Sequence, residues 1–225
     1  MEDKIILFDL DGTLIDTSKD IADAVLKVIG DEFPDQMNQS LNYKSIEKMI
    51  GRGAGPLIKS ALEILSIKPE KEILEQTIIK FREYYSEHLA DSSKAFKNIE
   101  KLLSNLKSQN IATAVATNKP GYLARILLPQ VLEHKFEIVY GPDDVGIAKP
   151  DPKMVRDIEK ITGKKAAALV GDTIVDQKTA ENASIAFIGV SWGLANFDHV
   201  KPGWSSVNDA LEIEEIIYKL LSENS

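Results

Sequence analysis

The sequence predicts an α/β fold, in which a parallel β-sheet is covered by helices on both faces and carries an inserted all-helical cap domain. Short apolar runs with the character of buried strands alternate with helical patterns through much of the chain, as is typical of a parallel sheet. A long segment after the first strand shows helical patterns only. The 225 residues are enough for a core domain with a smaller companion.

Five apolar runs, several of them rich in β-branched residues, are expected to be strands of the core. Helical periodicity lies between the later runs, for example at Val155, Ile158 and Ile161, and residues 207–221 are expected to form a packed terminal helix. The five expected strands are residues 5–8, 111–116, 136–140, 166–170 and 185–190.

The segment between the first two strands is too long for a simple crossover connection. One helix is expected from Thr17, a candidate N-cap, and an amphipathic helix is expected through residues 73–85. We therefore predict a core domain made of residues 1–15 and 92–225, and an inserted helical domain made of residues 16–91.

Composition limits the function classes. The chain has no cysteine, which excludes disulfides and thiolate chemistry. Its net charge of −8 is the wrong sign for a general nucleic-acid binder, so no nucleic-acid partner is expected. No apolar run reaches membrane-spanning length and no signal-peptide pattern opens the chain, so we expect a cytoplasmic protein without a membrane partner. A monomer and a homodimer both stay open.

Polar side chains follow four of the predicted strands, at the point where each strand or its loop ends. Because the carboxyl ends of parallel strands meet at one edge of the sheet, we expect these side chains to converge. In the order of the strands they follow, they are Asp9, Asp11, Thr117, Asn118, Lys149, Asp172 and Asp176.

This set of residues favours phosphoryl transfer. Crowded carboxylates repel one another unless a hard cation neutralises them, and an all-oxygen ligand set suits Mg²⁺. Lys149 and Thr117 are suited to hold phosphate oxygens. Asp9 can attack phosphorus and become an aspartyl phosphate, while Asp11 can protonate the leaving oxygen. Gly12 allows the tight turn between them and the next element.

The same residues resemble the motifs of the haloacid dehalogenase-like (HAD) hydrolase superfamily. "FDLDGTLID" resembles its first motif, Thr117 the second, Lys149 the third and "GDTIVD" the fourth. The resemblance implies a Rossmann-like core with a helical cap inserted after the first motif. It also implies that Asp9 is the nucleophile and a Mg²⁺ ligand, and that Asp11 is the general acid/base and lends its backbone carbonyl to the metal. The other implied roles are phosphoryl binding by Thr117 and Lys149, a metal ligand at Asp172, and metal support, direct or through water, from Asp176.

One position departs from the family pattern. Ser184 stands where relatives usually carry glycine, and we expect it to affect only the end of a helix.

Within the predicted cap, "MIGRGAGPLI" resembles the cap loop of phosphoglycolate phosphatases. Gly51 and Gly53 are expected to form a tight turn over the substrate, and Arg52 is a candidate for pairing with a carboxylate at its non-phosphate end. An ordinary exposed arginine is the equal alternative for Arg52.

The most specific function that these residues predict is hydrolysis of a small phosphorylated metabolite, such as 2-phosphoglycolate, with Mg²⁺ as cofactor. Asp11 argues against the dehalogenase branch, which has no carboxylate at that position. A phosphomutase similar to β-phosphoglucomutase shares all the core residues and is one alternative. A non-catalytic binding or regulatory protein on the same fold is the other.

Overall fold

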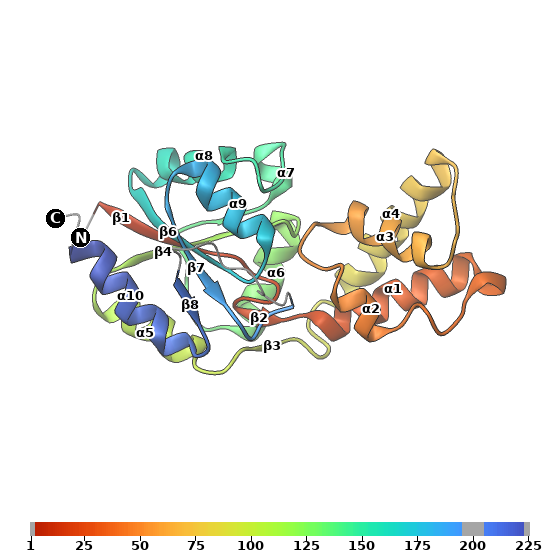
Figure 1. Cartoon of the computed structure of the whole chain (residues 1–225), viewed down its shortest axis with the longest axis horizontal. Helices are drawn as coiled ribbons and strands as arrows, with labels where there is room; N and C mark the ends of the chain where they lie inside the picture. Colours follow the sequence, from red (N-terminus) through yellow and green to blue (C-terminus); the bar gives the residue numbers. More distant parts are fainter. Residues whose placement is uncertain (1–2, 195–204, 223–225) are drawn as a thin grey trace.

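The computed structural model describes residues 3–194 and 205–222, and its core is a six-stranded parallel sheet (Figure 1). The strand order is β5-β4-β1-β6-β7-β8, and every neighbouring pair runs parallel. This confirms the predicted fold class. The strands are β1 (Lys4–Phe8), β4 (Ala112–Ala116), β5 (Val139–Tyr140), β6 (Lys165–Gly171), β7 (Ala186–Val190) and β8 (Ser205–Val207).

Apolar side chains on both faces of β1 hold the sheet between two layers of helices. Ile6 and Phe8 belong to the hydrophobic cluster shared with helices α5 (Ile99–Ser108) and α10 (Ala210–Ser222). Ile5 and Leu7 belong to a second cluster, shared with α8 (Lys153–Thr162) and α9 (Ile174–Ala183). Successive side chains of a strand point to opposite faces, so a continuous apolar run becomes a strand buried on both sides.

The order of the strands determines where a ligand can bind. The chain goes from β1 to β4 and β5 on one side, and then crosses to β6, β7 and β8 on the other side of β1. In open α/β sheets the crevice beyond the carboxyl ends at such a switch point is the usual ligand site. Two further helices, α6 (Gly121–Val131) and α7 (Pro142–Val145), follow β4 and β5 near this edge.

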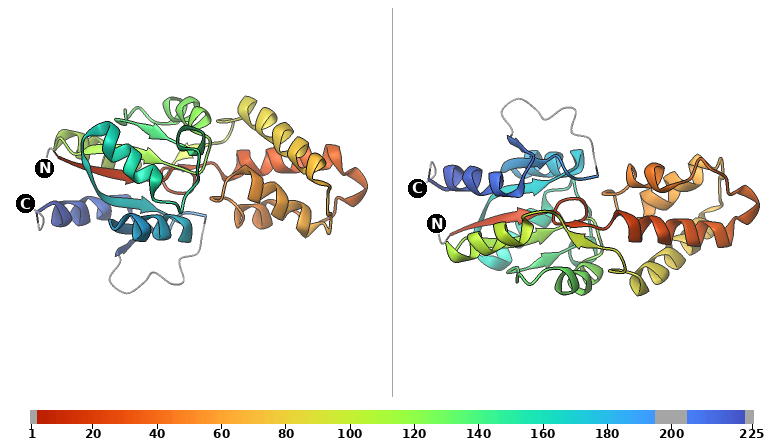
Figure 2. Two further views of the ribbon diagram at one scale, coloured as in Figure 1. Left: turned by 90° about the horizontal axis from the view of Figure 1, so that it is seen from above. Right: turned by 90° about the horizontal axis from the view of Figure 1, so that it is seen from below.

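The inserted helices form a separate group beside the sheet (Figures 1 and 2). We call them the cap helices: α1 (Ser18–Glu32), α2 (Tyr43–Glu47), α3 (Ala54–Ile64) and α4 (Lys71–Glu87), with the 3-10 turn η1 (Pro34–Gln36). Two chain segments join them to the core, and these segments pair antiparallel as β2 (Ile15–Asp16) and β3 (Lys94–Ala95). The domain boundaries at 15–16 and 91–92 stay a prediction.

Three details of the strands and helices differ from the expectation. Strand β5 covers only two of the five residues expected, 136–140, and the terminal helix begins at Ala210 rather than at 207. Strands β2, β3 and β8 were not expected, because two or three residues are too short to show a periodicity. No helix within the described part of the chain is both long enough and apolar enough to cross a membrane.

Ser184 ends α9 as expected. It adopts a left-handed conformation with φ of 58°, the conformation that glycine supplies most easily at this position.

Asp20 ties the first cap helix to the returning chain segment. Its buried Oδ2 accepts hydrogen bonds from the backbone N–H groups of Ser92 (3.1 Å) and Ser93 (2.8 Å), and from the Ser93 hydroxyl (2.6 Å). One carboxylate oxygen therefore fixes the segment by which the chain leaves the cap helices.

We expect Asp20→Ala to destabilise the protein by about 1–3 kcal/mol, because two backbone N–H groups lose their acceptor at a part-buried position. Urea denaturation measures the change. Ser93→Ala is the matched control, since it removes only the hydroxyl bonds to Asp20 and to the Leu89 carbonyl, keeps both N–H donors, and should cost less. Equal stability of Asp20→Ala and the wild type would contradict the role of Asp20.

Candidate active site

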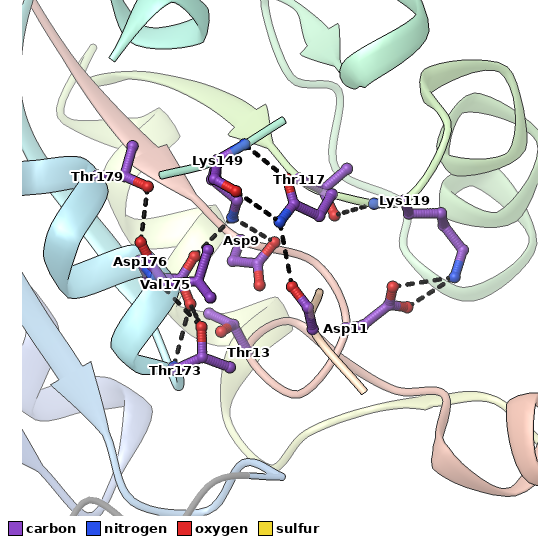
Figure 3. Close-up of polar contacts among 12 residues, drawn as sticks. Asp9, Asp11, Thr13, Thr117, Lys119, Lys149, Thr173, Val175, Asp176 and Thr179 are labelled. Carbon is purple, nitrogen blue, oxygen red and sulfur yellow. Dashed lines mark hydrogen bonds and ion pairs between the residues drawn. The ribbon is translucent and has the colours of Figure 1, made fainter. Parts of the chain in front are cut away.

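The polar residues predicted at the strand ends, Asp11 excepted, meet at the carboxyl edge of the sheet, and Figure 3 shows Asp9, Thr117, Lys149 and Asp176 there. The buried Asp9 directly follows β1, and its Oδ1 lies 2.9 Å from the Nζ of Lys149. The same Nζ lies 2.5 Å from Asp176 Oδ1. Lys149 thus lies between two carboxylates that come from different elements of the core.

Three buried carboxylates form a group that can hold a metal ion. Asp9, Asp172 and Asp176 each offer one oxygen, and these oxygens lie within 4.8 Å of one another. Asp172 is held in place because it accepts a hydrogen bond from the Thr13 hydroxyl (3.1 Å) and another from the Leu194 backbone N–H (2.8 Å).

The pKa values of these carboxylates show that their negative charges repel one another, and a cation would reduce that repulsion. Burial, together with the charge of Asp176, raises the pKa of Asp9 to about 7, although Lys149 opposes the shift. Burial and the charges of Asp176 and Asp9 raise the pKa of Asp172 to about 8. Burial alone would lower the pKa of Lys149, but Asp176 and Asp9 raise it above its ordinary value. Three carboxylates with one lysine leave excess negative charge, so the donor set fits a hard divalent cation.

Asp176 is the most fully engaged of the three carboxylates. Its Oδ2 accepts from the Thr173 hydroxyl (2.5 Å) and backbone N–H (3.0 Å), which forms the capping box of α9. Its Oδ1 pairs with Lys149. Among the described residues, each oxygen of Asp172 accepts only one hydrogen bond from a neutral donor, and Asp9 pairs with Lys149 through one oxygen, so Asp172 and Asp9 are the more available ligands.

Gly12 is required by the close approach of the first loop to Asp172. Its φ is 86°, and a Cβ at this position would lie 2.3 Å from Asp172 Oδ2. Any larger residue would displace the carboxylate or the turn.

Thr117 and Asn118 lie at the end of β4, as predicted. Thr117 is buried, and its Oγ1 accepts a hydrogen bond from the Lys119 backbone N–H (3.1 Å). Asn118 accepts from the Lys149 backbone N–H (2.8 Å) and donates to the carbonyls of Lys149 and Gly51 (both 3.2 Å). The Asn118 side chain therefore holds the Lys149 loop and reaches the loop before α3.

Asp11 lies apart from the other carboxylates. Figure 3 shows its side chain pointing away from Asp9 and towards Lys119, whose Nζ lies 2.8 Å and 3.0 Å from its two oxygens. Asp11 Oδ1 also accepts from the Thr17 hydroxyl (2.7 Å). Thr17 does occupy the N-cap position of α1 as expected, but its side chain bonds to Asp11 and makes no cap bond.

Lys119 and Tyr85 are the site residues that sequence reasoning missed. The Lys119 side chain is 3% exposed, and its Nζ also contacts the hydroxyl of Tyr85 (2.8 Å) on α4. Burial raises the pKa of that tyrosine to about 12. The place of Lys119, two residues after Thr117 in the same loop, was the only signal in the sequence.

A small cavity separates the core site from the cap helices. Its volume is about 50 Å³, and it opens beside Asp9, Asp11 and Thr117. Gly51 and Gly53 line it as predicted, but Arg52 is exposed and is not a lining residue, whereas the exposed Arg82 of α4 is. The substrate role of Arg52 stays a prediction.

Fold and site together define a hydrolase-type α/β protein, in which the buried Asp9 lies beside Lys149 and two further buried aspartates. Residues 6–190 match the haloacid dehalogenase-like hydrolase family. The chain belongs to this family.

The relatives of the chain include phosphatases. A phosphoglycolate phosphatase from Neisseria meningitidis serogroup A is 31% identical over 212 residues, which cover 88% of this chain and 87% of the relative. One from Aquifex aeolicus is 31% identical over 210 residues, covering 90% and 91%. A solved structure, described as a predicted phosphoglycolate phosphatase from Haemophilus somnus, has a TM-score of 0.81 at 25% identity and covers 96% of this chain and 99% of that one.

Proposed function

We propose that this protein is a Mg²⁺-dependent phosphatase that hydrolyses a small phosphorylated metabolite through an aspartyl phosphate on Asp9. The observation that carries the proposal is the position of Asp9: a buried carboxylate at the end of the central strand, beside the Lys149 ammonium and the carboxylates of Asp172 and Asp176. Family membership supports it.

In the first step an oxygen of Asp9 attacks phosphorus and the bond from phosphorus to the ester oxygen breaks. Asp11 gives its proton to that leaving oxygen. In the second step water attacks the phosphorus of the aspartyl phosphate and the bond from phosphorus to the Asp9 oxygen breaks. Asp11 takes a proton from the water, and phosphate leaves as the Asp9 carboxylate is restored. Lys149 and the Thr117 hydroxyl hold the phosphoryl oxygens, and Asn118 keeps the Lys149 loop in place.

The bound Mg²⁺ supplies positive charge that offsets the phosphoryl oxygens and the crowded carboxylates. Asp9 and Asp172 are proposed as its side-chain ligands, with the Asp11 backbone carbonyl beside them. Asp176 supports the metal less directly, because Lys149 and Thr173 already engage its oxygens.

The cavity beside Asp9 is lined by residues of the core and of the cap helices, so a substrate bound there contacts both. The named relatives are phosphoglycolate phosphatases, which supports 2-phosphoglycolate as the first substrate to assay.

If Arg52 pairs with the substrate carboxylate, Arg52→Ala should lose more activity on 2-phosphoglycolate than on p-nitrophenyl phosphate, which has no carboxylate. Steady-state kcat/KM for the two substrates measures this. Arg82→Ala is the matched variant, because this arginine lines the cavity. Equal losses on both substrates would remove Arg52 from any specificity role.

A phosphate-release screen over a few dozen metabolite phosphates, with Mg²⁺ present, tests the function itself. Release from a phosphorylated two- or three-carbon acid is the expected result. Conversion of β-glucose 1-phosphate to glucose 6-phosphate with a bisphosphate primer would show a phosphomutase instead. No phosphate release from any ester would favour a binding or regulatory protein.

A further inference from the structure

Among the residues that the structure describes, the only anionic partner of the buried Lys119 is Asp11, the proposed acid/base of the reaction. Its Nζ contacts both oxygens of Asp11 and the hydroxyl of Tyr85, and it lies 4.7 Å from the centre of the Tyr85 ring. The contact joins the loop after β4 to helix α4, so Lys119 lies where the core meets the cap helices.

The proposed reaction requires this ion pair to open. The Asp11 side chain points away from Asp9, towards Lys119, whereas the leaving oxygen of a phosphate ester lies on the phosphorus that Asp9 attacks. Asp11 must therefore turn from Lys119 to reach that oxygen. Lys119 would then be a buried ammonium with a tyrosine hydroxyl as its remaining partner, an arrangement that is costly without a counter-ion.

The walls of the cavity supply no replacement anion. Leu57 and Phe81 of the cap helices and Leu123 of α6 make part of the lining apolar. Among the described lining residues the cations are Lys119 and Arg82, and only Lys119 is buried. Apart from Asp9 and Asp11 themselves, no carboxylate is among these lining residues.

We propose that Lys119 is a specificity-determining residue that binds a carboxylate on the non-phosphate end of the substrate, in the place that Asp11 leaves. The inference rests on the proposed function and deepens it, because it names the residue that recognises the carboxylate of phosphate esters of small hydroxy acids. A phosphate ester of the same size without a carboxylate leaves Lys119 without a counter-ion when Asp11 turns. The carboxylate of an acid takes the place of Asp11 as that counter-ion.

Two non-hydrolysable ligands of matched shape test this assignment. 3-Phosphonopropionate has the shape of 2-phosphoglycolate, with a CH₂ group in place of the ester oxygen, and propylphosphonate replaces its carboxylate by a methyl group. Titration calorimetry of the Mg²⁺-loaded protein gives both Kd values without any proton transfer by Asp11. The wild type should bind 3-phosphonopropionate at least about tenfold more tightly than propylphosphonate, and Lys119→Met should bring the ratio close to one.

Lys59→Met is the matched control, because it removes an exposed lysine of α3 outside the cavity lining, and it should keep the preference for the acid. Arg52→Met tests the alternative that the exposed Arg52 binds the carboxylate. A preference that survives Lys119→Met, or one that disappears only in Arg52→Met, would overturn the inference. Circular dichroism checks the fold, and Lys119→Gln, which keeps an N–H donor for Asp11 but removes the charge, replaces Lys119→Met if that variant does not fold.

The screen of phosphate release separates this inference from the proposed function. A wild type that hydrolyses phosphate esters but shows a Kd ratio insensitive to Lys119 refutes the inference alone. A wild type that hydrolyses no phosphate ester refutes the proposed function, whatever the two Kd values are.

Discussion

Asp9→Asn should reduce turnover by at least about 10⁴-fold, because an amide oxygen is a poor nucleophile and no aspartyl phosphate can form. Asparagine has nearly the same shape, and Lys149 keeps its pair with Asp176. The variant should therefore fold, with a Tm close to that of the wild type. Steady-state kinetics on the best substrate of the screen, together with thermal denaturation, measure both effects.

Asp31→Asn is the matched control for this substitution. Asp31 lies on α1, its side chain is 59% exposed, and its partner is the nearby Lys27. The control should keep the wild-type kcat, since exposed ion pairs of this kind contribute little. A folded Asp9→Asn protein with more than a trace of activity would show that another group attacks phosphorus.

Removal of Mg²⁺ should have the second-largest effect. Chelation by EDTA should reduce activity to background, and added Mg²⁺ should restore it, because the metal offsets the charge of Asp9, Asp172 and the phosphoryl group. Saturating Mg²⁺ should also raise the Tm, since an ion that binds only the folded state stabilises it by about 2.7 kcal/mol at 100 times its Kd.

Asp172→Asn should lose both responses, the restored activity and the rise in Tm. Asp143→Asn is the control, because the Asp143 carboxylate accepts hydrogen bonds from the N-terminus of α6 and is not part of the carboxylate cluster. This variant should keep the restored activity and the rise in Tm. Activity that resists the chelator would show that the carboxylate group has another role.

The stability of the metal-free protein should fall as the pH rises from about 5 to about 8.5. The pKa values of Asp9 and Asp172 are raised from 3.8 to about 7 and about 8, so the folded state binds protons that the unfolded state has lost. The stability that these protons supply is complete below pH 3.8 and is lost as the pH rises through the raised values. Urea denaturation at several pH values measures the trend, and saturating Mg²⁺ should reduce it. A metal-free protein that gains stability over this range would contradict the burial of like charges.

The sequence was sufficient for the parts of the site that depend on the parallel sheet. Asp9, Thr117 and Asp172 each follow a predicted buried strand, and the shared direction of parallel strands brings such residues together whatever the loops do. Lys149 lies in a loop further from its strand, and the structure places its Nζ between Asp9 and Asp176. Its phosphate-binding role stays a prediction.

The contacts between the core and the cap helices could not be predicted in this way. Tyr85 precedes Lys119 by 34 residues, and their contact depends on how α4 packs against the loop after β4. A helical pattern says which face of α4 is apolar but gives no indication of what that face meets. The direction of the Asp11 side chain could not be predicted for the same reason. Hydrogen bonds from Thr17 and Lys119 determine it, and no sequence motif indicates these two contacts.

The proposed mechanism depends on a covalent bond between Asp9 and phosphorus. Borohydride reduces an acyl phosphate of aspartate to homoserine, so enzyme quenched during turnover of the best substrate with Mg²⁺ can be reduced and read by peptide mass spectrometry. The account predicts homoserine at position 9, and none in Asp9→Asn. Homoserine at another position, or an unmodified Asp9 in every quenched sample of an active enzyme, would contradict it.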